Sequence, residues 1–141
     1  MTSEQNKALV RRFNVEVHNE HDLSAIDRFF SPTFVDHSAA DYGDTGTREG
    51  TKMFFQATFA SVPDFGVDIR EQAADGDKVF TFKTVHGTHR GTWMGIPPTG
   101  KQFSVNVIDI LTVVDGQFTE HWIVMDMLGL LQQLGVIPAT A

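Results

Sequence analysis

The chain has 141 residues, of which 41% are hydrophobic and twelve are Phe, so we expect one folded domain over 1–141 and not a disordered segment. Eleven basic against eighteen acidic residues give a formal net charge of −7, and the basic residues form no cluster, which argues against a nucleic-acid partner or an anionic membrane surface. No cysteine is present, so disulfide bonds and thiolate chemistry are excluded.

The start of the chain has no targeting pattern. Residues Met1 to Gln5 are polar and lack the apolar core of a secretion signal. No apolar run elsewhere approaches the ~20 residues that span a membrane. We therefore expect a cytoplasmic protein with no membrane partner.

The first half of the chain has the pattern of helices. A capping-box pair is followed by apolar residues at intervals of four, which predicts a helix to about residue 18: Thr2, Gln5, Leu9, Phe13 and Val17. Asp22 can cap a short second helix, and Thr47 a third that Pro63 ends. The third helix includes Phe54, and its Phe residues point around most of its circumference, so we expect burial on more than one side. Before it, residues 34–37 look extended, and 38–46, with Tyr42, form a polar loop able to cover a cavity.

The second half of the chain has a period of two. Strands are predicted at 65–70, 79–90, 105–114 and 118–126, and a last helix at 127–134. Within the strand 79–90, Phe82 and His86 share one face, and Lys83 lies on the other. Because a lysine marks the wetter face, we expect Phe82 and His86 to point inward.

The last two strands join through Asp115-Gly116, a strong hairpin signal. A tight turn there sets Asp109 opposite Trp122, and alternation places both, with Asp126, on the more apolar face. His121 falls on the other face and is interpreted as a surface or interface residue. A carboxylate among apolar neighbours is costly unless it is paired or protonated for use. The apolar face is therefore where we expect chemistry.

The order of elements defines the fold class. Helices come first and about four antiparallel strands follow, which predicts an α+β domain with helices packed on one face of a curved sheet. Such a sheet closed by helices makes a cone, and its interior is a natural pocket for a small hydrophobic molecule.

Several motifs, taken together and in this order, resemble the SnoaL-like polyketide cyclase (ester cyclase) family of the nuclear-transport-factor-2-like superfamily. The motifs are Phe34–His37, Thr45–Gly50, Val62–Asp64, Gly87–Gly91, Met94–Lys101, Glu120–Trp122, Asp126 and Leu130–Gly135. The resemblance implies a cone-shaped α+β barrel that forms homodimers or homotetramers. For the cyclases it implies an intramolecular aldol condensation that closes the last ring of an aromatic polyketide methyl ester, without metal or cofactor. It also implies a catalytic aspartate in the last strand, and Asp126 matches that position.

Each candidate residue also has a structural interpretation. Asp126 is placed to cap the last helix, and a carboxylate at a strand end can both cap and face a cavity. Asp109 is either a structural carboxylate or a functional one, with His86 as its best histidine partner. His37 borders the polar loop and is able to bind a carbonyl or enolate oxygen. The expected substrate wall is formed by Trp122, Tyr42, Phe54 and Phe82. No two histidines have the spacing of a metal site on a strand or a helix, so no metal is expected.

Two other functions fit the same fold. A ligand-binding module would keep the cone without chemistry, and its Asp126 would be occupied by helix N–H groups. An epoxide hydrolase relative would use an aspartate to activate water, with a second carboxylate and a buried arginine nearby. The sequence offers no clear buried arginine, so we favour acid/base carbon chemistry on a hydrophobic carbonyl compound.

Overall fold

The structure, a computed structural model, describes residues 1–139. Five strands form one sheet in the order β1-β5-β4-β3-β2: β1 (Phe30–Asp36), β2 (Gly66–Asp75), β3 (Lys78–Thr88), β4 (Gln102–Val114) and β5 (Gln117–Met125). Four of them are the predicted antiparallel strands. The extended segment near residues 34–37 is part of a fifth strand, β1, which runs parallel to β5.

Four α-helices accompany the sheet: α1 (Ser3–Phe13), α2 (Ile26–Phe29), α3 (Arg48–Ser61) and α4 (Met127–Gln133). The predicted capping box at Thr2 and Gln5 is confirmed, and Thr47 caps α3 by accepting from the Gly50 N–H. A π-helical segment at 14–19 extends α1, and short 3₁₀ turns occupy 23–25 and 39–42.

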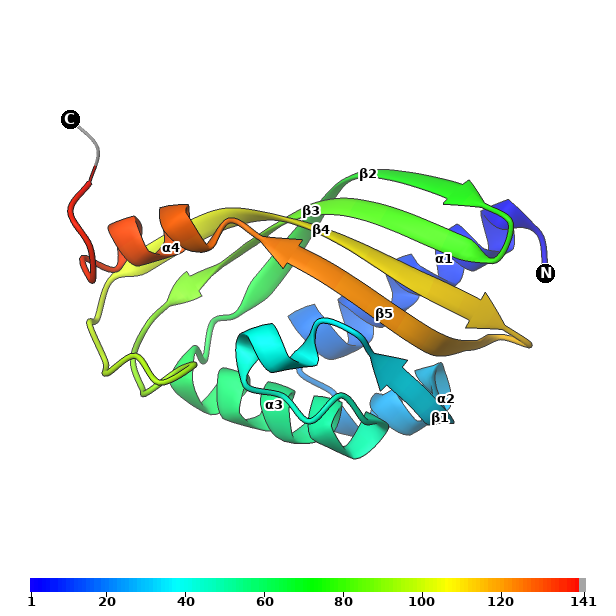
Figure 1. Ribbon diagram of the computed structural model, residues 1–141, viewed down its shortest axis with the longest axis horizontal. Helices are drawn as coiled ribbons and strands as arrows, with labels where there is room; N and C mark the ends of the chain where they lie inside the picture. The colour runs from blue at the N-terminus through cyan, green and yellow to red at the C-terminus, as the bar shows by residue number, and fades with distance from the viewer. Residues whose placement is uncertain (140–141) are drawn as a thin grey trace.

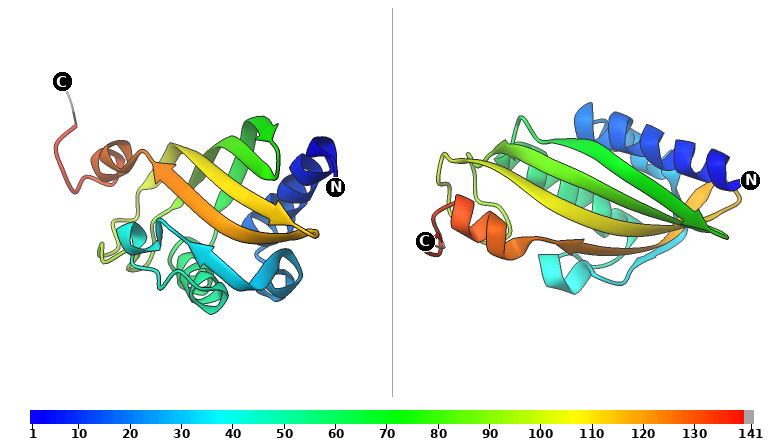
Figure 2. Two further views of the ribbon diagram at one scale, coloured as in Figure 1. Left: turned by 45° about the vertical axis from the view of Figure 1, so that its right-hand side comes forward. Right: turned by 90° about the horizontal axis from the view of Figure 1, so that it is seen from above.

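The elements form two layers, with α1 and α3 on the same side of the curved sheet (Figures 1 and 2). The strand faces that meet these helices are apolar, and β4 buries every second side chain from Phe103 to Val113. Two clusters fill the space: one around Phe13, Phe29 and Phe118, the other around Trp93 and neighbouring residues. The α+β class is confirmed, and the helices close the concave side of the sheet.

The β4–β5 hairpin turns tightly, because both Asp115 and Gly116 adopt positive φ (51° and 75°). A bulge follows: Val113 pairs with Phe118 and Thr112 with Glu120, so Thr119 is an additional residue in β5. The extra residue exchanges the two faces of β5 beyond it. Asp109 therefore lies opposite Ile123, and the predicted pairing with Trp122 is wrong.

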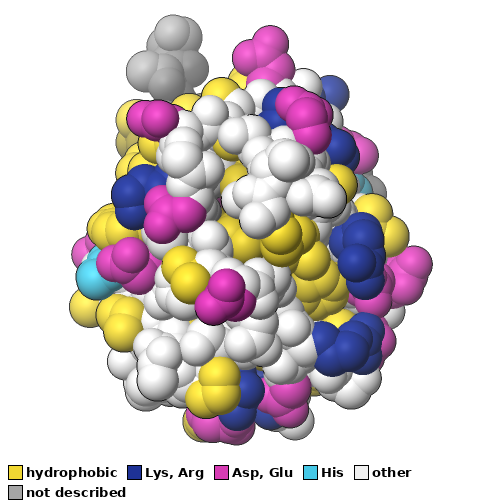
Figure 3. All heavy atoms as spheres, turned by 90° about the vertical axis from the view of Figure 1, so that its right-hand side faces the viewer, with side chains coloured by type: hydrophobic (Ala, Val, Ile, Leu, Met, Phe, Trp, Pro, Cys, Tyr) yellow, Lys and Arg dark blue, Asp and Glu magenta, His cyan; other side chains and the backbone are white. Residues whose placement is uncertain are grey.

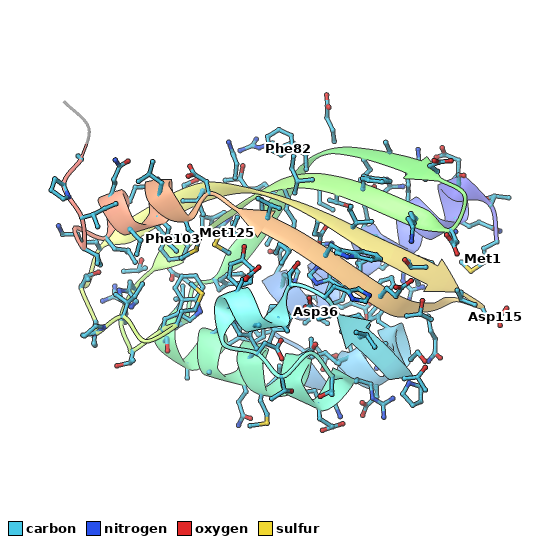
Figure 4. All side chains as sticks on the ribbon, viewed as in Figure 1. Met1, Asp36, Phe82, Phe103, Asp115 and Met125 are labelled. Atoms are coloured by element: carbon cyan, nitrogen blue, oxygen red, sulfur yellow. The ribbon has the colours of Figure 1, made fainter. Side chains whose placement is uncertain are left out.

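The predicted faces of β3 are also reversed. Lys83 is only 2% exposed and lies on the inner face, while Phe82 and His86 lie on the outer face. Figure 4 shows Phe82 pointing away from the helix layer. The lysine is inside because the inner face supplies it with a carboxylate partner, Asp109.

Much of the outer face of the sheet is apolar and open to solvent. Ile108, Val124 and Phe80 are 53%, 74% and 37% exposed. At the end of the molecule seen in Figure 3, acidic and basic side chains are interspersed, with hydrophobic side chains visible between them. The expected homodimer or homotetramer stays a prediction.

Candidate active site

A cavity of about 90 Å³ lies between the inner face of the sheet, α3 and the 3₁₀ turn at 39–42. Phenylalanine and aliphatic side chains form most of its wall. The polar residues of the wall that concern the chemistry are Asp36, Tyr42, Asp44, Lys83, Asp109 and His121. They come from β1, the loop after it, and the three central strands, so the sheet register brings together residues distant in sequence.

Four of these side chains form a continuous chain of charged hydrogen bonds. His121 donates from Nδ1 to Asp36 Oδ2 (2.9 Å) and from Nε2 to Asp109 Oδ2 (3.1 Å). Lys83 Nζ donates to the same oxygen of Asp109 (3.2 Å). Two carboxylates and two cations thus alternate, and the network carries no net charge in a dry environment.

The π-helical segment supports the lysine from the opposite side. Asn14 Oδ1 accepts from Lys83 Nζ (3.0 Å) and lies 2.9 Å from His18 Nδ1, and the Asn14 amide donates to the Val10 carbonyl (2.8 Å). Asn14 is 1% exposed and His18 5% exposed. The wider π-helical turn thus gives the buried ammonium a second fixed acceptor.

The network changes how its members titrate. Burial alone would raise the pKa of Asp109, but the adjacent Lys83 ammonium and His121 imidazolium hold it well below its usual range. Burial would lower the pKa of His121, but hydrogen bonds to Asp109 and Asp36 raise it to about 9. Burial and the Lys83 charge lower the pKa of His18 well below its ordinary value, so this ring is neutral. The cavity therefore holds an ionised aspartate and a protonated histidine at neutral pH.

Three groups in the wall keep hydrogen-bonding capacity for a ligand. Asp109 Oδ1 is buried and has no hydrogen-bond partner among residues 1–139. The Lys83 ammonium has three hydrogens and uses one for Asn14 and one for Asp109. The Tyr42 oxygen accepts from the Met125 N–H (3.1 Å), so its own proton remains to be donated. One acceptor and two donors with unused hydrogen-bonding capacity thus belong to residues that line one apolar cavity, although Asp109 Oδ1 itself is buried.

Asp126 does not reach this cavity. Its side chain accepts from the Gly129 N–H (2.9 Å), caps α4 and is exposed. The expected orientation toward the pocket is wrong for two reasons. The bulge exchanges the faces on which the preceding side chains of β5 lie, and the backbone leaves the strand at Asp126. Only the capping role is supported by the geometry.

Four other predicted site residues also lie outside the cavity. His86 is on the outer face, 3.3 Å from Asp68, and not beside Asp109. Trp122 is on the outer side after the bulge and stacks on His37 with ring centroids 4.6 Å apart. His37 in turn contacts Glu120 Oε2 at 2.9 Å and is 39% exposed. Phe82 is on the outer face as described above, so none of these four contributes to the inner wall.

Asp109, Tyr42 and Phe54 are the predicted residues that the structure does place in the cavity wall. Sequence reasoning missed His121, Lys83 and Asp36. In the observed register Lys83 pairs with Val107, two residues from Asp109, and opposite charges on such a diagonal share a face. This register comes from the structure, so the sequence alone carries no signal for Lys83.

Neither a metal cluster nor a membrane-spanning helix is found in the part of the chain that the structure describes. No three His, Asp or Glu side chains there are arranged to hold a metal ion. Each helix within residues 1–139 is too short or too polar to cross a membrane.

The fold and the site together define a class of small α+β proteins with an apolar cavity and a buried ionic network between the sheet and the helices. The sequence model of SnoaL-like polyketide cyclases matches residues 8–134, and the chain belongs to this family. The family resemblance seen in the sequence motifs is thereby confirmed.

Similar proteins are known in streptomycetes. Nogalonic acid methyl ester cyclase of Streptomyces nogalater is 27% identical over 125 residues, which covers 86% of this chain and 91% of the relative. Aklanonic acid methyl ester cyclase DnrD of Streptomyces peucetius is 28% identical over 131 residues, or 90% and 88%. The solved structure of TsrD from Streptomyces laurentii has a TM-score of 0.87 at 30% identity, covering 97% of this chain and 99% of that chain.

Proposed function

We propose that this protein is a ring-closing cyclase that carries out an intramolecular aldol condensation on an aromatic polyketide methyl ester, since two of its relatives are named as methyl ester cyclases. One observation carries the proposal: Asp109 Oδ1 is a buried acceptor without a partner among residues 1–139, and its carboxylate lies beside the Lys83 ammonium in an apolar cavity. An aldol reaction needs a base for a proton next to a carbonyl group, and a donor for the oxygen that becomes negative.

In the first step Lys83 donates its remaining hydrogen to a substrate carbonyl oxygen, and Asp109 Oδ1 takes a proton from the adjacent carbon. An enolate and a neutral carboxyl group result. The low pKa of Asp109 makes its carboxylate a weak base, but the Lys83 cation that lowers this pKa also stabilises the enolate oxygen and so lowers the pKa of the carbon that loses the proton. The carboxylate and the enolate oxygen both adjoin the Lys83 cation, so most of the electrostatic stabilisation is retained.

In the second step the enolate carbon attacks a second carbonyl of the same molecule, toward whose oxygen Tyr42 donates its hydroxyl proton as a hydrogen bond. The alkoxide that forms takes the proton back from Asp109. The carboxylate is regenerated and the product is an isomer of the substrate, so no step uses a metal or cofactor. His121 and Asp36 fix the Asp109 side chain and its charge, and act as positioning residues.

The proposal is tested by two matched Asp→Asn variants assayed with aklanonic acid methyl ester or nogalonic acid methyl ester, with the ring-closed isomer separated by chromatography. For Asp109→Asn we expect turnover to fall by roughly 10²–10⁴-fold, the range for loss of a general base. For Asp126→Asn we expect near-normal turnover, since asparagine also caps helices. The reverse pattern would refute the assignment to Asp109 and support the motif-based one.

A second candidate, epoxide hydrolysis, is favoured by a different observation. Asp36 and Asp109 place two carboxylates in one cavity, with the His121 cation between them. In this reaction one carboxylate would activate a water molecule and a protonated group would donate to the epoxide oxygen. Formation of a diol from styrene oxide, lost in Asp36→Asn, would favour this function over the cyclase.

A further inference from the structure

A second hollow, of about 370 Å³, lies outside the cavity already described. Its walls are the loop at 42–45, one side of α3 and the loop at 92–95. Drug-sized ligands occupy pockets of roughly 300–1,000 Å³. The inner cavity of about 90 Å³ is far below that range, whereas the outer hollow falls within it.

The two spaces adjoin. Tyr42, Asp44 and Phe54 line both of them, so these three residues, called the neck below, lie between the inner cavity and the outer hollow. Burial raises the pKa of the half-buried Asp44, which is also close to Asp36. The neck therefore combines an aromatic ring, a phenol and a carboxyl group on the boundary that the two spaces share.

The loop at 92–95 forms the far wall of the outer hollow, and Trp93 in it is 3% exposed, so only a small part of its ring borders the hollow. Trp93 is held in place because its indole N–H donates to Thr58 Oγ1 (2.9 Å) and its ring stacks on Phe103 with centroids 5.2 Å apart. Met53 and Met94 supply thioether side chains, which adapt to and favour aromatic rings. The Phe54 ring, the two methionines and the exposed part of Trp93 favour a planar ring system over a flexible chain.

We propose that the outer hollow binds the already formed planar ring system of the substrate, while the reacting ketone arm passes the Tyr42–Asp44–Phe54 neck and reaches Asp109. This inference rests on the proposed cyclase function, and it adds the subsite that selects for fused aromatic substrates. Ala57 lies on the α3 side of the hollow, so its small side chain determines how large a ring system fits.

The test uses an unreactive ring compound, 1,8-dihydroxyanthraquinone, and the fluorescence of Trp93. Trp93 and Trp122 are the two tryptophans of the chain, so a Trp122→Phe background leaves only the fluorophore in the hollow wall. We expect the compound to quench Trp93 with a saturable binding curve. In the same background Ala57→Phe fills the hollow and is expected to weaken binding at least tenfold.

The matched control is Ala60→Phe, which places the same ring at an exposed position of α3 that lines neither space. It is expected to leave the dissociation constant unchanged. If Ala57→Phe does not fold by circular dichroism, Ala57→Leu replaces it, with a smaller expected loss. No saturable quenching in the parent, or equal weakening by the variants at 57 and 60, would overturn the proposal.

Failure of this inference is distinguishable from failure of the cyclase function. The compound has no ketone arm to cyclise, so its binding is expected to be the same in Asp109→Asn. If the protein binds the compound in the expected pattern but does not cyclise the methyl esters, the subsite is supported and the proposed reaction is refuted. If the protein cyclises the esters but does not show that binding pattern, the proposed reaction is supported and the subsite is refuted.

Discussion

Two aspartate–histidine pairs lie on opposite faces of the same sheet, Asp109–His121 inside and Asp68–His86 outside. Their nitrogen–oxygen distances are similar, 3.1 Å and 3.3 Å. The side chains of the outer pair are 62% and 42% exposed, those of the inner pair 3% and 16%. The inner pair also has further partners in Asp36 and Lys83. Burial and the number of charged partners, more than contact distance, therefore determine which pair stays ionised and available for acid/base chemistry.

The largest expected effect comes from removing the Lys83 ammonium, which is hydrogen-bonded to Asp109 of the inner pair. Lys83→Met leaves the Asp109 carboxylate buried with one cation fewer, and we expect the free energy of unfolding to fall by about 3–5 kcal/mol. Urea denaturation followed by circular dichroism measures this. Lys78→Met on the same strand, where the ammonium donates to Thr112 and lies 4.8 Å from the Trp122 ring centroid, should cost less than about 1 kcal/mol.

The double variant Lys83→Met/Asp109→Leu makes this prediction sharper. Replacing a buried ion pair with apolar residues of similar size is often neutral, so we expect most of the stability to return while cyclisation stays absent. That outcome would mean that the network is maintained for chemistry and not for folding. Stability equal to that of Lys83→Met alone would contradict this interpretation.

A smaller effect is expected at the second acceptor of the lysine. Asn14→Leu removes the oxygen that Lys83 and His18 share, which leaves a buried donor without a partner and should cost about 1–3 kcal/mol. Urea denaturation also measures this change. The control is Asn19→Leu in the same π-helical segment, because Asn19 forms hydrogen bonds with the Val67 backbone and not with the ionic network. Only Asn14→Leu should also reduce turnover.

The inner pair should give stability a characteristic pH dependence. Because the folded protein raises the pKa of His121 to about 9 from an ordinary 6.5, its contribution is fully present below about pH 6.5 and is lost as pH rises toward 9. The slope is at most about 1.4 kcal/mol per pH unit. Denaturation midpoints at pH 6.5, 8 and 9.5 should fall in the parent and stay nearly level in His121→Gln. A parent curve without this decline would contradict the described network.

The smallest effect is expected at the outer pair. His86→Gln removes a solvent-exposed partner of Asp68 and should change the free energy of unfolding by less than about 0.5 kcal/mol. Its alkaline decline in stability should match that of the parent. A loss comparable to that of His121→Gln would mean that exposure does not separate the two pairs.

Much of the fold was predictable because its signals are local. The capping residues Thr2 and Thr47, the Asp115-Gly116 turn and the change of period after Pro63 each act within a few residues of chain. They fixed the helices, the hairpin and the α+β class. The addition of β1 beside β5 was not predictable in this way, because parallel pairing joins segments about 85 residues apart.

The site was less predictable, because two of its determinants are not local. The bulge at Thr119 has no clear sequence signature, yet it moves His121 inward and Trp122 outward. The inward position of Lys83 depends on Asp109 and Asn14, which belong to other elements. Asp109 was identified because a carboxylate stands out in an apolar strand face. Lys83, which alternates with Phe82, instead indicated the solvent-facing side of its strand.

The loop that covers the cavity also protects an open strand edge. Beyond the end of β1, the hydroxyl of Ser38 accepts from the Ile123 N–H (3.0 Å) and that of Tyr42 from the Met125 N–H (3.1 Å), in place of a neighbouring strand. Any ligand entry that lifts this loop bares two backbone donors, and such edges are templates for intermolecular pairing. A bound ligand that holds the loop down would therefore slow amide exchange at positions 123 and 125 and reduce the tendency to aggregate.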